Sequence, residues 1–308
     1  METTVTTSRG EFAALSEGPG RGPVVIVQHG FPDVPHTFVP VMKLLAAAGC
    51  RVVAPYLRGY APGPPEGPWT LESLAEDACA LAEALGMGTP VTYVGHDWGA
   101  IAGYLAAARM PGRFAGLVTV SVPHPLAFAR SLGREPAQLW RSRYMVELQP
   151  RGVGEWLLAR DDFAMVDRLW ARWSPGLARP EEHLGRVKAC LRASGGAPLG
   201  YYRSIGRPVG RAVSRLFDRE LRRIRVPTRH LTGGDDGCVG PRVGLGQERY
   251  FCGPFASEII AGVGHFLPLE RPTLLVERTL DLMAATGALP AEARPTRPGA
   301  AGPGRGSA

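Results

Sequence analysis

The sequence predicts an α/β protein with a mostly parallel, doubly wound sheet and an inserted helical cap. Over residues 24–121, short apolar runs alternate with helical patterns, which is typical of βαβ units. Residues 123–225 then show helical stretches rich in Arg and Trp, without a convincing strand. Strand patterns return at 228–231 and 257–260, which indicates that the chain re-enters the sheet after the insertion.

The first βαβ unit is predicted over residues 24–54. Residues 24–28 (VVIVQ) form a short, mostly β-branched run that stops at the turn-rich HGFPD, as expected of a strand buried on both faces. A helical pattern opens at Thr37 and is closed by Gly49. A second strand is expected at 51–54.

The following elements come after a Pro/Gly-rich loop at 56–68. Thr70 can cap a helix through Leu85, because its hydroxyl can accept a backbone N–H that has no partner within the helix. The other elements expected in the sheet domain are a strand at 91–94, a helix from the turn at 95–99 to about Arg109, a strand at 117–121 and a helix at 271–284.

These elements divide the 308-residue chain into a sheet domain and an insertion. We expect a core domain at 1–122 and 226–287, and a helical cap at 123–225. The segment 288–308 is mostly Pro, Gly, Ala and Arg with almost nothing to bury, so we expect it to be disordered.

The composition does not favour a nucleic-acid partner, although the net charge is +7. Lys occurs only at positions 43 and 188, so 33 of the 35 basic residues are Arg, and they are spread along the chain. Asn is absent, and together with the scarcity of Lys this indicates codon bias. The five Cys lack C-x-x-C spacing, so neither a disulfide framework nor a metal site is expected.

The sequence also shows neither a membrane-spanning segment nor an export signal. No apolar run reaches the roughly 18 residues needed to cross a bilayer. The N-terminus has no basic region followed by an apolar one. We therefore expect a protein without a membrane span, located in the cytoplasm.

The turn at 95–99 (GHDWG) carries the strongest chemical signal. It joins a strand to a helix and has the form Gly-x-nucleophile-x-Gly, with Asp97 in the nucleophile position. Glycine fits both flanking positions because a Cβ would clash in so tight a turn, while the helix N-terminus aims its N–H groups at the reacting centre. On its own, the pattern also fits an Asp that caps a helix.

Three further turns follow predicted strands. In HGFP, the backbone N–H of Phe31 could converge with that of Trp98 on one oxygen. TGGDDG supplies an acid, Asp235 or Asp236, and GVGH supplies His265. Nucleophile, acid and His then occur in the chain order of a Ser…Asp…His hydrolase in which Asp replaces Ser.

The segments HGFPD, GHDWGA and GVGHFLP resemble the oxyanion, nucleophile and histidine motifs of the epoxide hydrolase branch of the α/β-hydrolase superfamily. The resemblance covers about residues 22–284. It implies the α/β-hydrolase fold, with Asp97 as nucleophile and His265 as base. The acid aligns best with Asp236, since a following Pro then falls at the family's spacing, and Asp235 stays open.

The resemblance also implies two cap tyrosines that hold the epoxide oxygen. Tyr144 precedes a Leu-Gln pair at the family's spacing, and Tyr202 precedes an Arg. Without the resemblance, both would suit ordinary packing of the cap. We expect His29, Pro32 and Trp140 to line the substrate pocket, although His29 also suits a turn-organising role and the cap tryptophans also suit a core.

An Asp nucleophile suits attack on an sp3 carbon, because the product is an ordinary alkyl ester rather than a reactive anhydride. We therefore predict hydrolysis of an epoxide to a vicinal diol through an ester on Asp97. His265, oriented by Asp236, would activate water, and Tyr144 and Tyr202 would hydrogen-bond the alkoxide. No metal or cofactor is needed. The expected partners are a small-molecule epoxide and water, in a monomer or homodimer.

Two alternatives remain at this stage. The first is haloalkane or haloacid dehalogenation with the same Asp nucleophile, because a Trp beside the nucleophile also occurs in dehalogenases, where its indole N–H holds halide. Haloalkane dehalogenases commonly add an Asn or a second Trp, and this chain has no Asn. The second is a ligand-binding protein without catalysis, which the presence of Asp97, Asp236 and His265 disfavours.

Overall fold

The computed structural model describes residues 1–205 and 221–289. Their strands form one eight-stranded sheet in the order β1-β2-β4-β3-β5-β6-β7-β8. Strands β3 to β8 are parallel to one another, and β2 joins them antiparallel to β4. The bounds are β1 Glu2–Thr7, β2 Gly10–Glu17, β3 Val24–Gln28, β4 Arg51–Pro55, β5 Val91–His96, β6 Phe114–Val120, β7 Thr228–Gly233 and β8 Phe255–Ile260. The predicted fold class is confirmed.

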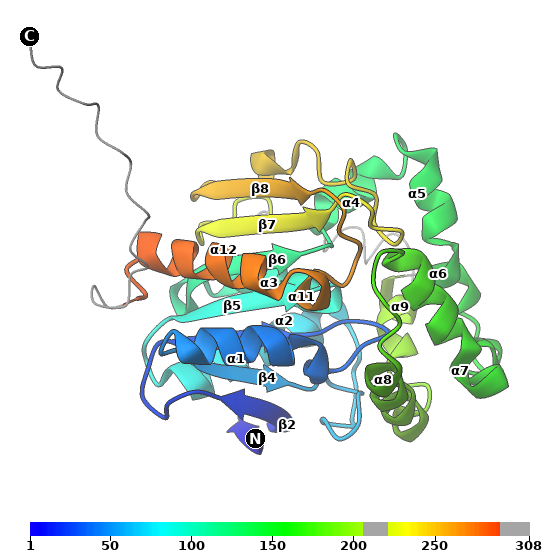
Figure 1. Cartoon of the computed structure of the whole chain (residues 1–308), viewed down its shortest axis with the longest axis horizontal. Helices are drawn as coiled ribbons and strands as arrows, with labels where there is room; N and C mark the ends of the chain where they lie inside the picture. Colours follow the sequence, from blue (N-terminus) through cyan, green and yellow to red (C-terminus); the bar gives the residue numbers. More distant parts are fainter. Residues whose placement is uncertain (206–220, 290–308) are drawn as a thin grey trace, which may run out of the picture.

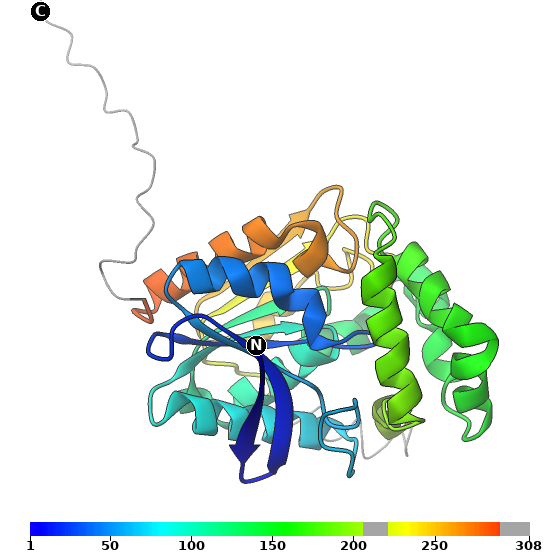
Figure 2. The ribbon, with the colours of Figure 1, turned by 60° about the horizontal axis from the view of Figure 1, so that its bottom comes forward.

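Helices cover both faces of the sheet (Figures 1 and 2). The helices α1 (Val39–Ala47) and α12 (Pro272–Ala285) pack with the sheet into one apolar cluster, and α2 (Leu71–Gly86) and α3 (Trp98–Arg109) pack into the other. Thr70 caps α2 as predicted, since its hydroxyl accepts the Ser73 N–H at 3.2 Å. Shorter helices are η1 Pro35–Phe38, η2 Pro111–Arg113, η3 Gln247–Tyr250 and α11 Leu267–Glu270.

The N-terminal hairpin of β1 and β2 is the element that the sequence patterns missed. Most of β1 is exposed and rich in Thr, so it lacks the apolar run that marks the inner strands. The hairpin turns at Gly10, whose φ of +113° only glycine adopts readily. Val5 pairs with Phe12, and these two side chains anchor the hairpin to the core.

The regular elements described between β6 and β7 are all helices, joined by loops. They are α4 Pro125–Ser131, α5 Pro136–Arg141, α6 Arg143–Glu147, α7 Val153–Trp173, α8 Glu181–Ser194 and α9 Leu199–Ile205. Most of these described helices, α5 to α9, lie beside the ends toward which the parallel strands point (Figure 1). Helix α7 is broken at Arg160–Phe163, where three residues take positive φ, so it consists of two helices joined by a tight turn.

The domain boundaries at 122/123 and 225/226 stay predictions, and part of the cap lies outside the described residues. The expected disordered tail began at 288, but Leu289 is only 3% exposed, so the chain still packs at that point. Residues 290–308 lie outside the described residues. Within the described ranges, no helix is long and apolar enough to cross a membrane.

Candidate active site

Asp97 stands in the turn between β5 and α3, as the GHDWG motif predicted. Its φ of 53° and ψ of −116° place a non-glycine residue in a strained conformation, which surrounding packing has to maintain. A Cβ on Gly95 would collide with the Gly99 carbonyl, and a Cβ on Gly99 would collide with the Gln28 carbonyl. Both glycines are therefore required by the close approach of backbone segments.

Backbone N–H groups converge on the Asp97 carboxylate. The Phe31 N–H donates to Asp97 Oδ1 at 2.8 Å. The Trp98 N–H also donates to this carboxylate and, like that of Phe31, acts to lower its pKa. A Cβ on Gly30 would overlap the Asp97 side chain, so only glycine lets the oxyanion turn approach this closely.

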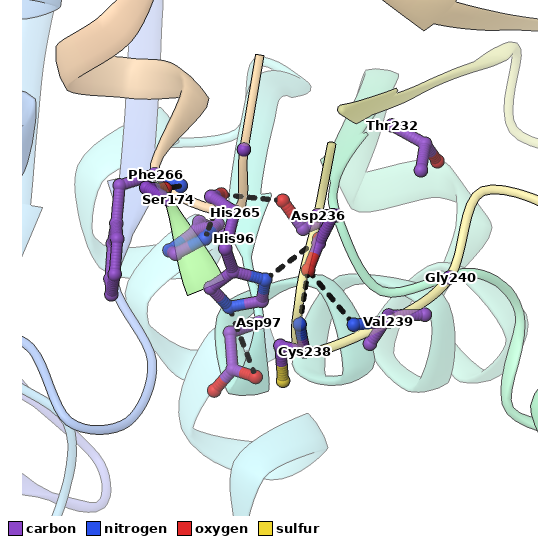
Figure 3. A network of polar contacts seen from close by, with 12 residues as sticks. His96, Asp97, Ser174, Thr232, Asp236, Cys238, Val239, Gly240, His265 and Phe266 are labelled. Atoms are coloured by element: carbon purple, nitrogen blue, oxygen red, sulfur yellow. Dashed lines mark hydrogen bonds and ion pairs between the residues drawn. The ribbon is translucent and has the colours of Figure 1, made fainter. Parts of the chain in front are cut away.

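His265 lies between two carboxylates (Figure 3). Its Nδ1–H donates to Asp236 Oδ2 at 2.9 Å, and its Nε2 is 3.8 Å from Asp97 Oδ2. Asp236 is buried, and its other oxygen accepts the backbone N–H groups of Cys238 and Val239 at 2.7 and 2.9 Å. The sequence left open whether Asp235 or Asp236 is the acid. In the structure Asp236 contacts His265, whereas the Asp235 side chain is exposed.

The buried charges shift each other's proton affinities. For His265, burial acts to lower the pKa, but the charge and hydrogen bond of Asp236 and the charge of Asp97 outweigh it, so the pKa is raised. For Asp97, burial raises the pKa, although the His265 charge and the N–H groups of Phe31 and Trp98 oppose this. The site therefore holds two groups whose protonation is coupled.

Tyr144 and Tyr202 come together in the cap above the carboxylate turn. Their rings contact edge to face at 5.7 Å between centroids, and the Tyr202 ring also contacts the Trp98 ring at 5.0 Å. Burial raises the pKa of both phenols well above the usual value, and the Asp97 charge acts in the same direction. Both groups thus hold their proton in the resting site and can donate it.

The three side chains expected in the substrate pocket lie in different surroundings. Trp140 is 68% exposed with the Arg143 guanidinium 4.1 Å from its ring, so it lies at the surface and its pocket assignment was wrong. His29 organises its turn: Nδ1 donates to the Gly30 carbonyl and Nε2 accepts the Leu57 N–H. These two bonds fit the turn-organising role, and the place of His29 in the substrate pocket stays a prediction.

The third residue, Pro32, is buried, and its carbonyl accepts the Trp170 indole N–H at 2.9 Å. This bond connects the oxyanion turn to cap helix α7. Trp170 and Trp173 are buried, as the core interpretation of the cap tryptophans expected, whereas Trp156 is 58% exposed.

Two buried residues lie near the carboxylate: sequence reasoning missed Tyr60 and favoured a core role for Trp173. Tyr60, in the loop after β4, is fully buried, and its hydroxyl has no hydrogen-bond partner in the described part of the chain. The charges of Tyr202 and Asp97 raise its pKa, after the larger effect of burial, which places it beside the site. Trp173 contacts the His265 ring at 5.0 Å. Neither residue lies in a motif, so no local pattern could have found them.

The fold and this arrangement define an α/β hydrolase with Asp in the strand-to-helix turn where a serine usually stands. A family model described as alpha/beta hydrolase fold matches residues 23–160. Epoxide hydrolase 3 of Xenopus tropicalis is 29% identical over 273 residues, covering 85% of this chain and 71% of that protein. Epoxide hydrolase A of Mycobacterium tuberculosis is 26% identical, covering 92% and 97%.

A solved structure agrees with these relatives. The Bacillus megaterium epoxide hydrolase in complex with an inhibitor superposes with a TM-score of 0.78 at 26% identity, covering 92% of this chain and 100% of that one. The chain is therefore an epoxide hydrolase-like hydrolase with the α/β-hydrolase fold, similar over most of its length to these epoxide hydrolases. The resemblance noted in the sequence motifs is confirmed.

Proposed function

We propose that the protein hydrolyses an epoxide to a vicinal diol through a covalent ester on Asp97. The observation that carries the proposal is the position of the His265 ring, with Nδ1 bonded to Asp236 and Nε2 facing Asp97. A base held in this way can activate water against an ester formed on that carboxylate.

In the first half-reaction, Asp97 Oδ2 attacks a ring carbon of the epoxide. Oδ1 is the oxygen that accepts the Phe31 N–H, so Oδ2 is the better placed nucleophile. A new C–O bond forms, the ring C–O bond breaks, and its electron pair goes to the epoxide oxygen. That oxygen takes a proton from Tyr144 or Tyr202, because an alkoxide is a strong base and needs an acidic O–H donor.

In the second half-reaction, His265 Nε2 removes a proton from water, and the resulting hydroxide attacks the ester carbonyl carbon of Asp97. Negative charge develops on Oδ1, where the N–H groups of Phe31 and Trp98 stabilise it. Asp236 stabilises the imidazolium that forms. Collapse of the tetrahedral intermediate releases the diol, and the proton on His265 passes to the leaving oxygen. The Asp97 carboxylic acid that is left gives up the second proton of the water, and the tyrosinate regains one, which restores the resting enzyme.

The test is intact-mass analysis of the His265→Gln protein after exposure to a panel of epoxides. Alkylation should proceed while hydrolysis stops, so the mass should rise by one epoxide and the adduct should map to the Asp97 peptide. The double variant Asp97→Ala/His265→Gln is the matched control and should gain no mass. An adduct that persists in the control would place the nucleophile elsewhere.

One observation favours dehalogenation as a second candidate. The indole nitrogens of Trp98 and Trp173 are both buried without hydrogen-bond partners among the described residues. Two such N–H groups suit a departing halide, which is already a stable anion and needs only weak donors. Exposure of the native protein to haloalkanes and haloacids decides between the candidates: halide release without turnover of any epoxide would replace the epoxide hydrolase proposal.

A further inference from the structure

Exposed apolar side chains gather on one part of the cap. Of the eleven large apolar side chains that are exposed in the described part of the chain, five lie within residues 139–156. Their exposed fractions are 51–71%, and they are Leu139, Trp140, Val146, Val153 and Trp156. The helices that carry them, α5, α6 and the first part of α7, form the outer edge of the cap (Figure 1). Single exposed apolar residues are normal on a protein surface, whereas a cluster of them marks a site of interaction.

Two arginines connect the exposed residues of α5 and α6 with those of α7. The Arg143 guanidinium lies 4.1 Å from the centroid of the Trp140 ring, and that of Arg160 lies 5.0 Å from the centroid of the Trp156 ring. Both arginines line one cleft, which has a volume of about 250 Å³. The two tryptophans therefore flank the same cleft, and each lies beside a cation.

Helical spacing places the valines on the same surface. Val153, Trp156 and Arg160 follow one another at intervals of three and four residues, so they share one face of α7. Arg143 and Val146 are three residues apart in α6 and share a face in the same way. We call the whole surface the Trp–Arg face, and it consists of Leu139, Trp140, Arg143, Val146, Val153, Trp156, Arg160, Arg168 and Arg172.

The centre of the Trp–Arg face carries an excess of positive charge. The charged side chains that line its cleft are Arg143, Arg160, Arg168, Arg172 and Glu147. Arg168 and Arg172 are exposed, and their side chains have no hydrogen-bond or ion-pair partner within residues 1–205 and 221–289. They are separated by one helical turn, so their charges repel each other and attract an external anion.

The acids of α7 that lie nearby do not neutralise this pair. Asp162 forms an ion pair with Arg192, and Lys188 lies 2.8 Å from Asp167. Both cations belong to α8 (Glu181–Ser194). The charge of Arg168 and Arg172 therefore stays available to a partner outside the chain.

The arrangement of the Trp–Arg face favours a lipid surface over a protein partner. Protein–protein interfaces have an apolar centre and a polar rim, whereas here the arginines are central and the exposed apolar residues flank them. A symmetric pair of copies would place the same arginines against one another. Tryptophan at the level of the headgroups and arginine at the lipid phosphates are the residues that suit an anionic bilayer surface.

We propose that the Trp–Arg face attaches the protein to an anionic lipid surface. Trp140 and Trp156 insert at the level of the headgroups, and Arg168 and Arg172 bind the lipid phosphates. This attachment goes beyond the proposed function and does not depend on it, because none of the four residues belongs to the groups around Asp97.

Flotation of the full-length protein with lipid vesicles tests the attachment. The native protein should float with vesicles of phosphatidylcholine and phosphatidylglycerol, and added salt should weaken the binding. Trp140→Ala/Trp156→Ala should weaken it about 10-fold, because two aromatic side chains no longer insert. Arg168→Gln/Arg172→Gln should weaken it about 10- to 30-fold, as expected for two arginines near an anionic surface. All these side chains are exposed, so circular dichroism should show an unchanged fold.

The matched control is Arg130→Gln/Arg134→Gln, which removes the same charge at the same spacing from a second cleft of about 240 Å³ without tryptophan in its lining. This variant should bind the vesicles within about twofold of the native protein, since no aromatic anchor holds its cleft at the bilayer. A native protein that does not float, native binding by the tryptophan variant, or an equal loss in both arginine variants would overturn the proposal. Binding of a polyglutamate peptide but not of vesicles would assign the face to an acidic protein instead.

Discussion

The backbone carbonyl of Trp173 accepts the N–H of His265 at 2.9 Å. Trp173 is the last residue of α7, where helix carbonyls have no partner within the helix. The same carbonyl accepts the Gly237 N–H at 3.2 Å, and the next residue, Ser174, accepts the Phe266 N–H through its hydroxyl. The C-terminal end of cap helix α7 is therefore hydrogen-bonded both to the loop that carries Asp236 and to the loop that carries His265.

Oxygen transfer tests the role of Asp97. If water attacks the ester carbonyl, the new oxygen stays on the enzyme in the first turnover, since the diol takes the original carboxylate oxygen. In a single turnover in 18O-water with enzyme in excess, the Asp97 peptide should gain label and the diol should not. Label found directly in the diol would mean that water attacks the epoxide without an ester.

Asp236 and Asp235 form a natural matched pair. Asp236→Asn should lower kcat by about 100-fold or more, because the Asp236 carboxylate orients His265 and stabilises its charged form. Asp235→Asn should change kcat little, since that side chain is exposed. Steady-state kinetics with one epoxide checks both variants, and the reverse ranking would move the acid to Asp235.

Proton donation by the cap tyrosines has a separate test. Tyr144→Phe and Tyr202→Phe each remove one hydroxyl and keep the ring, so each should slow ester formation by about 10- to 1000-fold, the range for loss of a general acid or oxyanion donor. The double variant should nearly abolish it. Rapid-quench measurement of the ester gives the rate, and circular dichroism confirms the fold. Wild-type epoxide turnover in the double variant would remove the tyrosines from the mechanism.

The coupling of His265 and Asp97 predicts a pH effect. The Asp97 charge contributes to the raised pKa of His265, and it disappears when Asp97 becomes an ester. The pKa of His265 should therefore be lower in the ester than in the free enzyme. Ester hydrolysis needs neutral His265, so its rate should fall on acidification around this lower value. NMR titration gives the pKa of His265 in the resting protein and in Asp97→Asn, and the pH dependence of ester decay gives its pKa in the ester. The value in the resting protein should be the highest of the three. Equal pKa values would show that Asp97 and His265 are not coupled.

Buried histidines make stability depend on pH: four of them, including His96, have a lowered pKa and outnumber His265, whose raised pKa acts in the opposite direction. Burial lowers the pKa of His29 to about 4 and those of His124 and His230 to about 3. The unfolded chain binds these protons below about pH 6.5, while the folded protein does not, so stability is present above that pH and is lost as the pH falls. The loss should reach at most about 1.4 kcal/mol per pH unit for each histidine. Urea unfolding between pH 7 and pH 5.5, where most carboxylates stay ionised, measures the slope; a flat profile would contradict it.

Sequence reasoning predicted the features that local patterns encode. The inner strands, the cap of α2 and the turns that carry Asp97, Asp236 and His265 all follow from apolar runs and from glycines at forced close approaches. The choice between Asp235 and Asp236 could not be made from spacing between residues alone, because it depends on which side chain the loop turns inward.

Features that depend on tertiary packing lay beyond local patterns. Trp140 and Trp173 are the same residue type in the same helical region, yet one is 68% exposed and the other fully buried. Which face of each helix meets the core is decided by how the helices pack, and short helices such as α5 carry too few turns to show it. Tyr60, in a loop, has no periodic pattern at all.

The hydrogen bonds from the Gly237 and His265 N–H groups to the Trp173 carbonyl depend on how the last turn of α7 is rotated about the helix axis. They do not depend on which side chain stands at that position. A backbone carbonyl is available from any residue, so the last turn of α7 can vary in sequence and still hold the Gly237 and His265 N–H groups. Inserting or deleting one residue after the break at Arg160–Phe163 would instead rotate that turn by about 100° and move the carbonyl off both loops. We therefore expect these two hydrogen bonds to tolerate changes of length before this break better than changes after it.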